Sequence, residues 1–221
     1  TGTTDIEFNG SGSNTWGSTY AVTFKHNIIF NMAGSLVISG GATGIAYNTG
    51  TITFTGGTVS HTGTLLVTGT CTFNTNGMSW NNFTISGTPT ITINSLLTLA
   101  GTMTTSTTTT FAGTSGWTVA NWTCITAGVT VTFANGVTYT LSGGNMTNVG
   151  TAASKILFTS DHAVTKAILT LVGVTEANVY LSGTRMDSSL GATVWTVGGV
   201  LTTTINWNLL TAPGTIAYGF V

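Results

Sequence analysis

The apolar residues of this chain alternate with polar ones, and a period of two is typical of β-strands. In residues 51–55 the side chains of Ile52 and Phe54 are separated by threonines. No stretch of useful length repeats its apolar residues at helical spacing. The pattern therefore predicts an all-β fold whose strands have one apolar and one polar face. The alternation recurs at Thr90–Ile93, Thr130–Phe133 and Thr138–Leu141.

A short unit also recurs along the chain. A glycine opens it, two apolar residues flank one position, a hydroxyl residue follows and a second glycine closes it, as in Gly34–Gly40, Gly50–Gly56 and Gly63–Gly69. The closing half returns at Gly87, Gly101 and Gly143. We interpret the unit as a short strand ended by a turn that needs a permissive backbone. Repeated units of this kind predict strands stacked in the coils of a solenoid.

A longer repeat fixes the expected coil length. Phe83-Thr84-Ile85 and Trp122-Thr123-Cys124 are 39 positions apart, and Leu97-Thr98-Leu99 and Tyr139-Thr140-Leu141 are 42 apart. Two coils of about 20 residues account for both offsets. The closing glycines are unevenly spaced, which predicts several strands per coil joined by turns of unequal length. A β-sandwich or jelly roll remains the alternative, because those folds also have short strands at regular spacing.

No linker divides the chain. We expect a solenoid body over residues 25–211, preceded by an N-terminal strand, cap or inter-subunit segment over residues 1–24. Residues 212–221 contain Pro213 and Gly214 and are expected to form a tail that leaves the core.

Charge is almost absent. The chain has 4 Lys and Arg and 5 Asp and Glu residues, and none of them lies between Lys25 and Lys155. The net charge of −1 provides no basic footprint for nucleic acid. No apolar run is long enough for a transmembrane segment. The surface must be built from Thr, Ser, Asn and Gly, and such neutral faces favour packing between copies of the chain.

The residues that could support catalysis are few. A glycosidase needs two carboxylates several ångströms apart, and Asp161 and Asp187 could meet across stacked coils. However, no set of nucleophile, base and orienting group is visible. The histidines have no second ligand at metal-binding spacing, because adjacent residues on a strand, such as Asp161 and His162, point to opposite faces. We therefore predict no enzyme, no cofactor and no metal site. The carboxylates are Asp5, Glu7, Asp161, Glu176 and Asp187, and the histidines are His26, His61 and His162.

The two cysteines, Cys71 and Cys124, alternate in phase with the apolar residues Phe73 and Trp122. Both are expected to point inward. Because two or three coils separate them, their Cα atoms should lie beyond the roughly 7 Å that a disulfide can bridge. We predict two free, buried thiols.

The tryptophans divide into two groups. Trp122 and Trp195 are in phase with inward residues and are expected in the core. Trp16, Trp80 and Trp117 lie near turns, and are the candidates for contact with a glycan or a partner chain.

Four tripeptides match the N-glycosylation acceptor. They begin at Asn9, Asn82, Asn121 and Asn145. In a chain so rich in threonine, we expect such matches to arise by chance.

The C-terminal part shows a family resemblance. The stretch TEANVYLSG (residues 175–183) leads into MDSSLG (residues 186–191), then to Trp195 and to INWN (residues 205–208). Over about residues 156–210 this resembles the closing coils of right-handed parallel β-helix proteins of bacteriophages and environmental bacteria. The resemblance implies a virion fibre, spike or bacterial surface adhesin. Tailspikes that cleave glycans carry clustered carboxylates along the helix groove, and the uncharged middle of this chain departs from that pattern.

The leading functional hypothesis is a non-enzymatic structural subunit of an extracellular fibre or phage appendage. Such a subunit would associate with copies of itself through Thr-, Ser- and Asn-rich faces and strand edges. One alternative is a glycan-binding adhesin on a cell or virion surface. The other is an ice-binding protein that uses outward pairs such as Thr51/Thr53 and Thr70/Thr72. Ice binding requires a regular row, against which the uneven repeat spacing argues.

Overall fold

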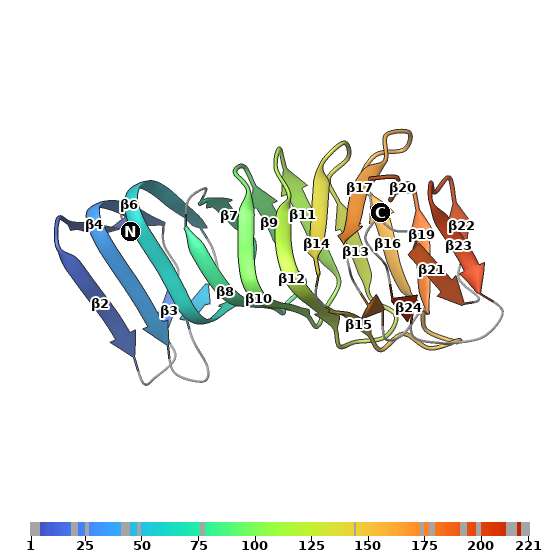
Figure 1. Cartoon of the computed structure of the whole chain (residues 1–221), viewed down its shortest axis with the longest axis horizontal. Coiled ribbons are helices and arrows are strands. Elements are labelled where there is room, and N and C mark those ends of the chain that lie inside the picture. Colours follow the sequence, from blue (N-terminus) through green and yellow to red (C-terminus); the bar gives the residue numbers. More distant parts are fainter. Residues whose placement is uncertain are drawn as a thin grey trace.

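The computed structural model is an elongated, all-β molecule whose strands lie side by side along its long axis (Figure 1). No helix occurs among the residues that it describes, which are 5–18, 22–24, 27–40, 45–47, 50–75, 78–143, 145–172, 175–176, 180–190, 194–197, 200–210 and 216–217.

Three parallel ladders run along the molecule, and we call them faces 1, 2 and 3. A strand segment on one face of one coil is called a rung. Face 1 begins with β1 and the first parts of the long strands β4 and β6, and it ends at β22. Its strands are β1 (Ile6–Gly10), β4 (Ile28–Gly40), β6 (Gly50–Val67), β7 (Cys71–Asn74), β9 (Thr90–Ile93), β11 (Thr109–Gly113), β13 (Thr130–Phe133), β16 (Ile156–Ser160), β19 (Leu181–Thr184) and β22 (Leu201–Thr202).

Faces 2 and 3 share several strands, because the long strands bend from one face to the next. Face 2 contains β2 (Ser13–Ser18), the later part of β4, the middle of β6, β8 (Ser79–Ile85), β10 (Leu97–Thr105), β12 (Trp117–Cys124), β14 (Thr138–Ser142), β17 (Ala167–Val172) and β20 (Met186–Asp187). Face 3 contains β3 (Val22–Phe24), β5 (Ile45–Tyr47), the later parts of β6, β8, β10 and β12, then β15 (Asn145–Asn148) and β18 (Thr175–Glu176).

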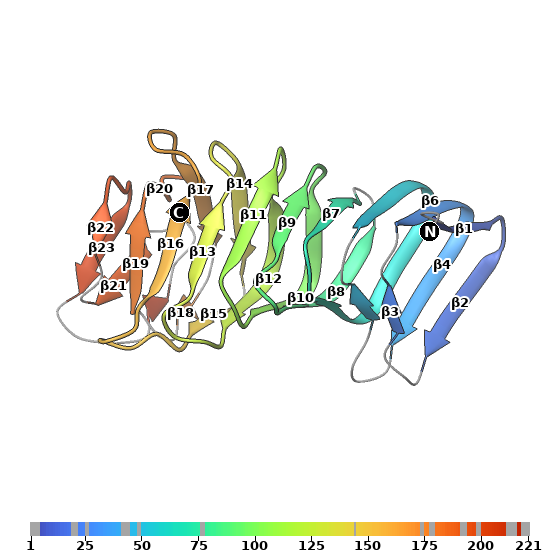
Figure 2. The same cartoon turned by 180° about the vertical axis from the view of Figure 1, so that it is seen from behind.

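The chain visits faces 1, 2 and 3 in turn and then repeats the circuit. Figure 1 shows β10, β12 and β14 of face 2 in front, and Figure 2 shows β9, β11 and β13 of face 1 from behind. This confirms the predicted parallel β-solenoid. A sandwich or jelly roll is excluded, because those folds are built from antiparallel sheets.

The predicted coil length is confirmed by the register. Phe83 pairs with Met103, which pairs with Trp122, so the 39-residue offset spans two coils. In the same way Leu99 pairs with Val119 and Val119 with Leu141. Two predicted strands, Thr90–Ile93 and Thr130–Phe133, have the expected bounds.

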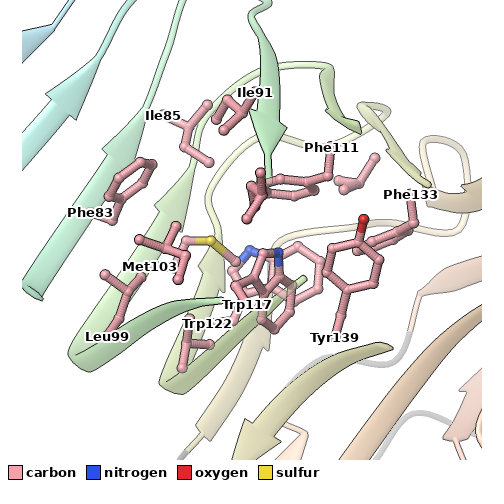
Figure 3. Packing of buried hydrophobic residues seen from close by; sticks show 14 of the residues in the cluster. Phe83, Ile85, Ile91, Leu99, Met103, Phe111, Trp117, Trp122, Phe133 and Tyr139 are labelled. Carbon is pink, nitrogen blue, oxygen red and sulfur yellow. The ribbon is translucent and has the colours of Figure 1, made fainter. Parts of the chain in front are cut away.

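One continuous core runs through the coils. Inward residues of successive rungs stack on one another, and the largest of them gather in the middle of the molecule (Figure 3). Trp117 and Trp122 pack edge to face with ring centroids 5.5 Å apart, and Trp122 stacks on Phe158 at 4.8 Å. Aromatic pairs of this geometry stabilise by about 0.5–1.5 kcal/mol each beyond the area they bury.

The bends between faces 2 and 3 use side-chain amides. The ladder shifts register between Leu99 and Thr102, and there the Asn82 Oδ1 atom accepts a hydrogen bond of 2.9 Å from the Thr102 backbone N–H. A Cβ at Gly101 would collide with the side chains of Asn81 and Asn82. The amide therefore takes the space that a side chain at position 101 would occupy, and satisfies a backbone donor that the bend leaves unpaired.

The two ends of the chain both join the ladders. Strands β1 and β2, within the segment 1–24, pair in parallel with β4. Within residues 212–221, β24 (Ile216–Ala217) pairs antiparallel with β18. The described part of the expected tail thus returns to the sheet. Strands β21 (Val194–Val197) and β23 (Trp207–Leu210) form a separate parallel pair.

Candidate functional surface

Two of the predicted contact tryptophans are core residues. Trp80 is 3% exposed and Trp117 is 0% exposed. The prediction that they contact a glycan or partner is therefore wrong: each occupies an inward position of its strand, close to a turn in sequence but covered by neighbouring coils. The Trp16 and Trp195 side chains lie outside the described residues. Trp122, at 1% exposed, is confirmed as core.

The polar residues singled out as possible catalysts hold turns. The Asp161 Oδ1 atom accepts hydrogen bonds from the backbone and side-chain nitrogens of Asn135, at 2.8 and 3.0 Å. The Asp187 carboxylate accepts one from the Ser189 N–H at 2.8 Å. The His162 Nδ1 atom accepts from the Thr165 N–H at 2.9 Å. Among the described residues, no group of three His, Cys, Asp or Glu side chains could hold a metal ion.

Cys71 and Cys124 are both free and buried, as predicted. They lie on different faces, since Cys71 pairs with Ile91 on face 1 and Cys124 with Thr105 on face 3. Burial raises the pKa of the Cys71 thiol to about 12. Burial also raises the pKa of Cys124, to about 11, against a smaller lowering by its hydrogen bond to the Thr126 carbonyl. Protonated thiols of this kind are poor nucleophiles.

The main surface feature is a column of threonines on face 1. Six consecutive rungs each place a threonine at the same outward position, and each of these residues is the register partner of the next. Thr70 precedes them, since its hydroxyl accepts a hydrogen bond from the Thr90 N–H. We call this the face-1 threonine column. Its six members are Thr90, Thr110, Thr132, Thr159, Thr184 and Thr202.

A second outward row borders this column over part of its length. Thr51 pairs with Thr72 and Thr72 with Thr92, so three rungs carry threonine there. On the other side, the Thr108 hydroxyl accepts a hydrogen bond from the Thr130 N–H. Four successive rungs therefore each present a Thr-x-Thr pair, at residues 70/72, 90/92, 108/110 and 130/132.

The row is regular even though the repeat spacing is uneven. Thr90 and Thr110 are 20 positions apart, whereas Thr132 and Thr159 are 27 apart, yet both are register pairs. The additional residues are accommodated outside the paired strands. Uneven spacing therefore does not argue against a regular threonine row, and that part of the sequence interpretation is wrong.

Faces 2 and 3 carry shorter threonine columns. That of face 2 includes Thr170, which is only 9% exposed. On face 3 the threonines adjoin the bend that contains Asn82, whose amide oxygen is bonded to the next rung. The face-2 column is Thr98, Thr118, Thr140 and Thr170, and the face-3 column is Thr84, Thr104, Thr123 and Thr147.

Comparisons of this chain with protein-family models, curated proteins and solved structures found no match. The solenoid fold that the resemblance over residues 156–210 implied is present in the structure. Within the described ranges, no helix is long and apolar enough to cross a membrane.

Proposed function

We propose that this protein is a non-enzymatic structural subunit of an extracellular fibre or phage appendage. The observation that carries the proposal is the parallel ladder of face 1, which continues from β1 to β22 without a break. The resemblance over residues 156–210 supports a place on a virion or cell surface.

The mechanism of such a subunit is mechanical. Backbone hydrogen bonds between rungs run along the long axis, so tension along that axis is shared by three ladders. The stacked core resists bending, because interiors packed at crystal-like density are hardly compressible. The aromatic cluster around Trp117 and Phe133 strengthens the middle of the rod, where their ring centroids are 6.4 Å apart.

The neutral faces support association between copies. No charged residue occurs from position 26 to position 154, so copies that pack side by side in this region meet no like-charge repulsion. Threonine loses little side-chain freedom on packing, since its branched Cβ already restricts χ1. Association through the edge strand β1 is less favourable, because Glu7 places a carboxylate there and charges on edge strands oppose pairing. We therefore expect faces to contribute more than the β1 edge.

The test is the association state of the purified protein. Analytical ultracentrifugation and electron microscopy over a range of concentrations are expected to show oligomers or filaments. Thr118→Lys on face 2 and Thr104→Lys on face 3 place a charge in the neutral region and should shift the equilibrium toward monomers. Thr114→Lys is the matched control, because Thr114 is exposed in a turn outside the columns. A wild-type protein that stays monomeric at every concentration would overturn the proposal.

The glycan-binding alternative loses support from the structure. Trp80 and Trp117, two of the three side chains on which it rested, are buried and cannot stack on a sugar ring. A glycan array remains its direct test, and binding there would require contacts other than these two rings.

A further inference from the structure

The face-1 threonine column has a property that a structural rod does not need. It repeats one uncharged hydroxyl and one methyl group at the rung spacing of about 4.8 Å over six rungs. Where a second row is present, the two rows are separated by two residues along the strand, or about 6.6 Å. The result is a line of hydroxyl groups with a second line beside it, on one side at the rungs of Thr72 and Thr92 and on the other side at those of Thr108 and Thr130.

We infer that this column binds the surface of ice. A ligand gains from a periodic array only if its own groups repeat at the same distance, because many weak contacts then form together. Rows of oxygen atoms on ice repeat at a distance close to the rung spacing. The ladder fixes the positions of the Cα atoms, and the branched Cβ of threonine fixes χ1. The hydroxyls are thus ordered before the ligand arrives, which reduces the entropy cost of binding.

The hydroxyls of the first three members of the column are available for such contacts. The side-chain hydroxyls of Thr90, Thr110 and Thr132 make no hydrogen bond to another residue in the part of the chain that the structure describes. Farther along, Thr159 accepts a hydrogen bond of 3.2 Å from the Arg185 Nη2 group. We therefore place the centre of the ice-binding surface at Thr90, Thr110 and Thr132.

Face 1 fits this role better than the other two faces. Its column spans six rungs, against four on face 2 and four on face 3. The last member of the face-2 column, Thr170, is buried, so only three of its threonines face outward. An ordered polysaccharide is a different periodic ligand, but its recognition relies on aromatic rings that stack on the sugars. The outward residues of face 1 from β7 to β22 include no aromatic ring.

The three-sided fold provides matched controls within one molecule. Thermal hysteresis and inhibition of ice recrystallisation are measured on the monomeric fraction of the wild type and of single lysine variants. Thr110→Lys and Thr132→Lys on face 1 should abolish both activities. Thr118→Lys on face 2 and Thr104→Lys on face 3 add the same charge to the same kind of strand position and should leave them unchanged.

Folding is checked by circular dichroism for each variant. Thr110→Val is added because it keeps the methyl groups and the strand preference while removing one hydroxyl, and it should weaken the activity without loss of structure. Absence of hysteresis in the wild type would overturn the inference, and so would equal losses on all three faces. Binding to crystalline cellulose or chitin without any effect on ice would also overturn it. The use of monomers keeps this result separate from the association test above.

Discussion

A methyl group at Gly116 is the most direct test of the spacing between coils. Gly116 is buried just before β12, and its carbonyl accepts a hydrogen bond of 3.2 Å from the Leu97 N–H. A Cβ at this position would overlap the carbonyl oxygen of Thr138 on the next coil and would lie 2.9 Å from its carbonyl carbon. The obstacle is backbone held in a ladder, so it cannot rotate away as a side chain could.

The expected cost of Gly116→Ala follows from this geometry. Adding a methylene to a well-packed interior costs roughly 1–3 kcal/mol when side chains can adjust. Here two coils must separate locally, so we expect the free energy of unfolding to fall by about 3 kcal/mol or more.

Alanine substitutions at three other glycines distinguish a clash between coils from other causes of lost stability. Gly12→Ala meets nothing within 4 Å and should change stability by less than about 0.5 kcal/mol. Gly136 also has open space but a φ of 68°, so alanine there should cost about 1–2 kcal/mol through backbone conformation alone. Gly101→Ala displaces the Asn82 amide and also brings a Cβ within 2.9 Å of the Asn81 backbone carbonyl oxygen, so it should cost more than the roughly 1 kcal/mol of the lost hydrogen bond.

Urea unfolding, followed by circular dichroism and by tryptophan fluorescence, measures the free energy of unfolding of each glycine variant and so ranks their losses of stability. The two probes are compared because solenoids can lose their coils in stages, and the buried indoles report mainly on the middle of the rod. If Gly116→Ala is no more destabilising than Gly12→Ala, the register between β12 and β14 is wrong. If Gly136→Ala is the more severe change, backbone conformation rather than coil spacing dominates.

Two further predictions concern the core. Thr105→Val removes the acceptor of the buried 3.0 Å hydrogen bond from the Trp122 indole, and should lower the free energy of unfolding by about 1–3 kcal/mol, whereas Thr104→Val on the outer side should be nearly neutral. The free energy of unfolding should also fall as the pH rises above 9.0, the ordinary pKa of a cysteine thiol. The thiols of the unfolded chain then ionise, whereas burial raises the pKa of Cys71 to about 12 and that of Cys124 to about 11, so both stay protonated in the folded protein. Urea titrations at pH 8 to 10 should show a weaker pH dependence when both cysteines are replaced by alanine, and an unchanged dependence would contradict the burial of the thiols.

The strands and the coil repeat could be predicted from the sequence because inward residues must be apolar in every coil. The alternation at Thr90–Ile93 gives a strand with the same bounds in the structure. The alignment of Phe83 with Trp122 two coils away, each paired with Met103 between them, follows from the same rule, since all three occupy inward positions of the same face.

The buried tryptophans were misplaced for a physical reason. Many rungs of this solenoid are only three or four residues wide, so nearly every residue is close to a turn. Proximity to a turn therefore carries no information about exposure. The phase within the strand does: Trp117 alternates with Val119, and Trp80 with Met78, and all four side chains are buried. The same criterion had correctly placed Trp122.

The threonine column could not be seen in the sequence, because the distance between its members varies with the turns. Thr132 and Thr159 come together only once the pairing of β13 with β16 is known. The turn over residues 149–155 takes up part of the excess length. In a solenoid with unequal turns, the outward rows are thus a property of the register, and only the register reveals whether a surface is periodic.

Two of the tripeptides that match the glycosylation acceptor lie at equivalent positions of different coils. Those that begin at Asn82 and Asn121 place Phe83 and Trp122 on the same inward line, with Met103 of the intervening coil between them. The intervening coil has threonine at position 102, which is the register partner of Asn121. It therefore lacks the acceptor motif, although its backbone occupies the equivalent position. At the first of these tripeptides the bend between faces 2 and 3 uses the asparagine itself, because the Asn82 amide oxygen accepts a hydrogen bond from the Thr102 N–H of the next coil. The tripeptide at Asn82 thus coincides with an asparagine that the bend uses, and for the other tripeptides a chance origin stays a prediction.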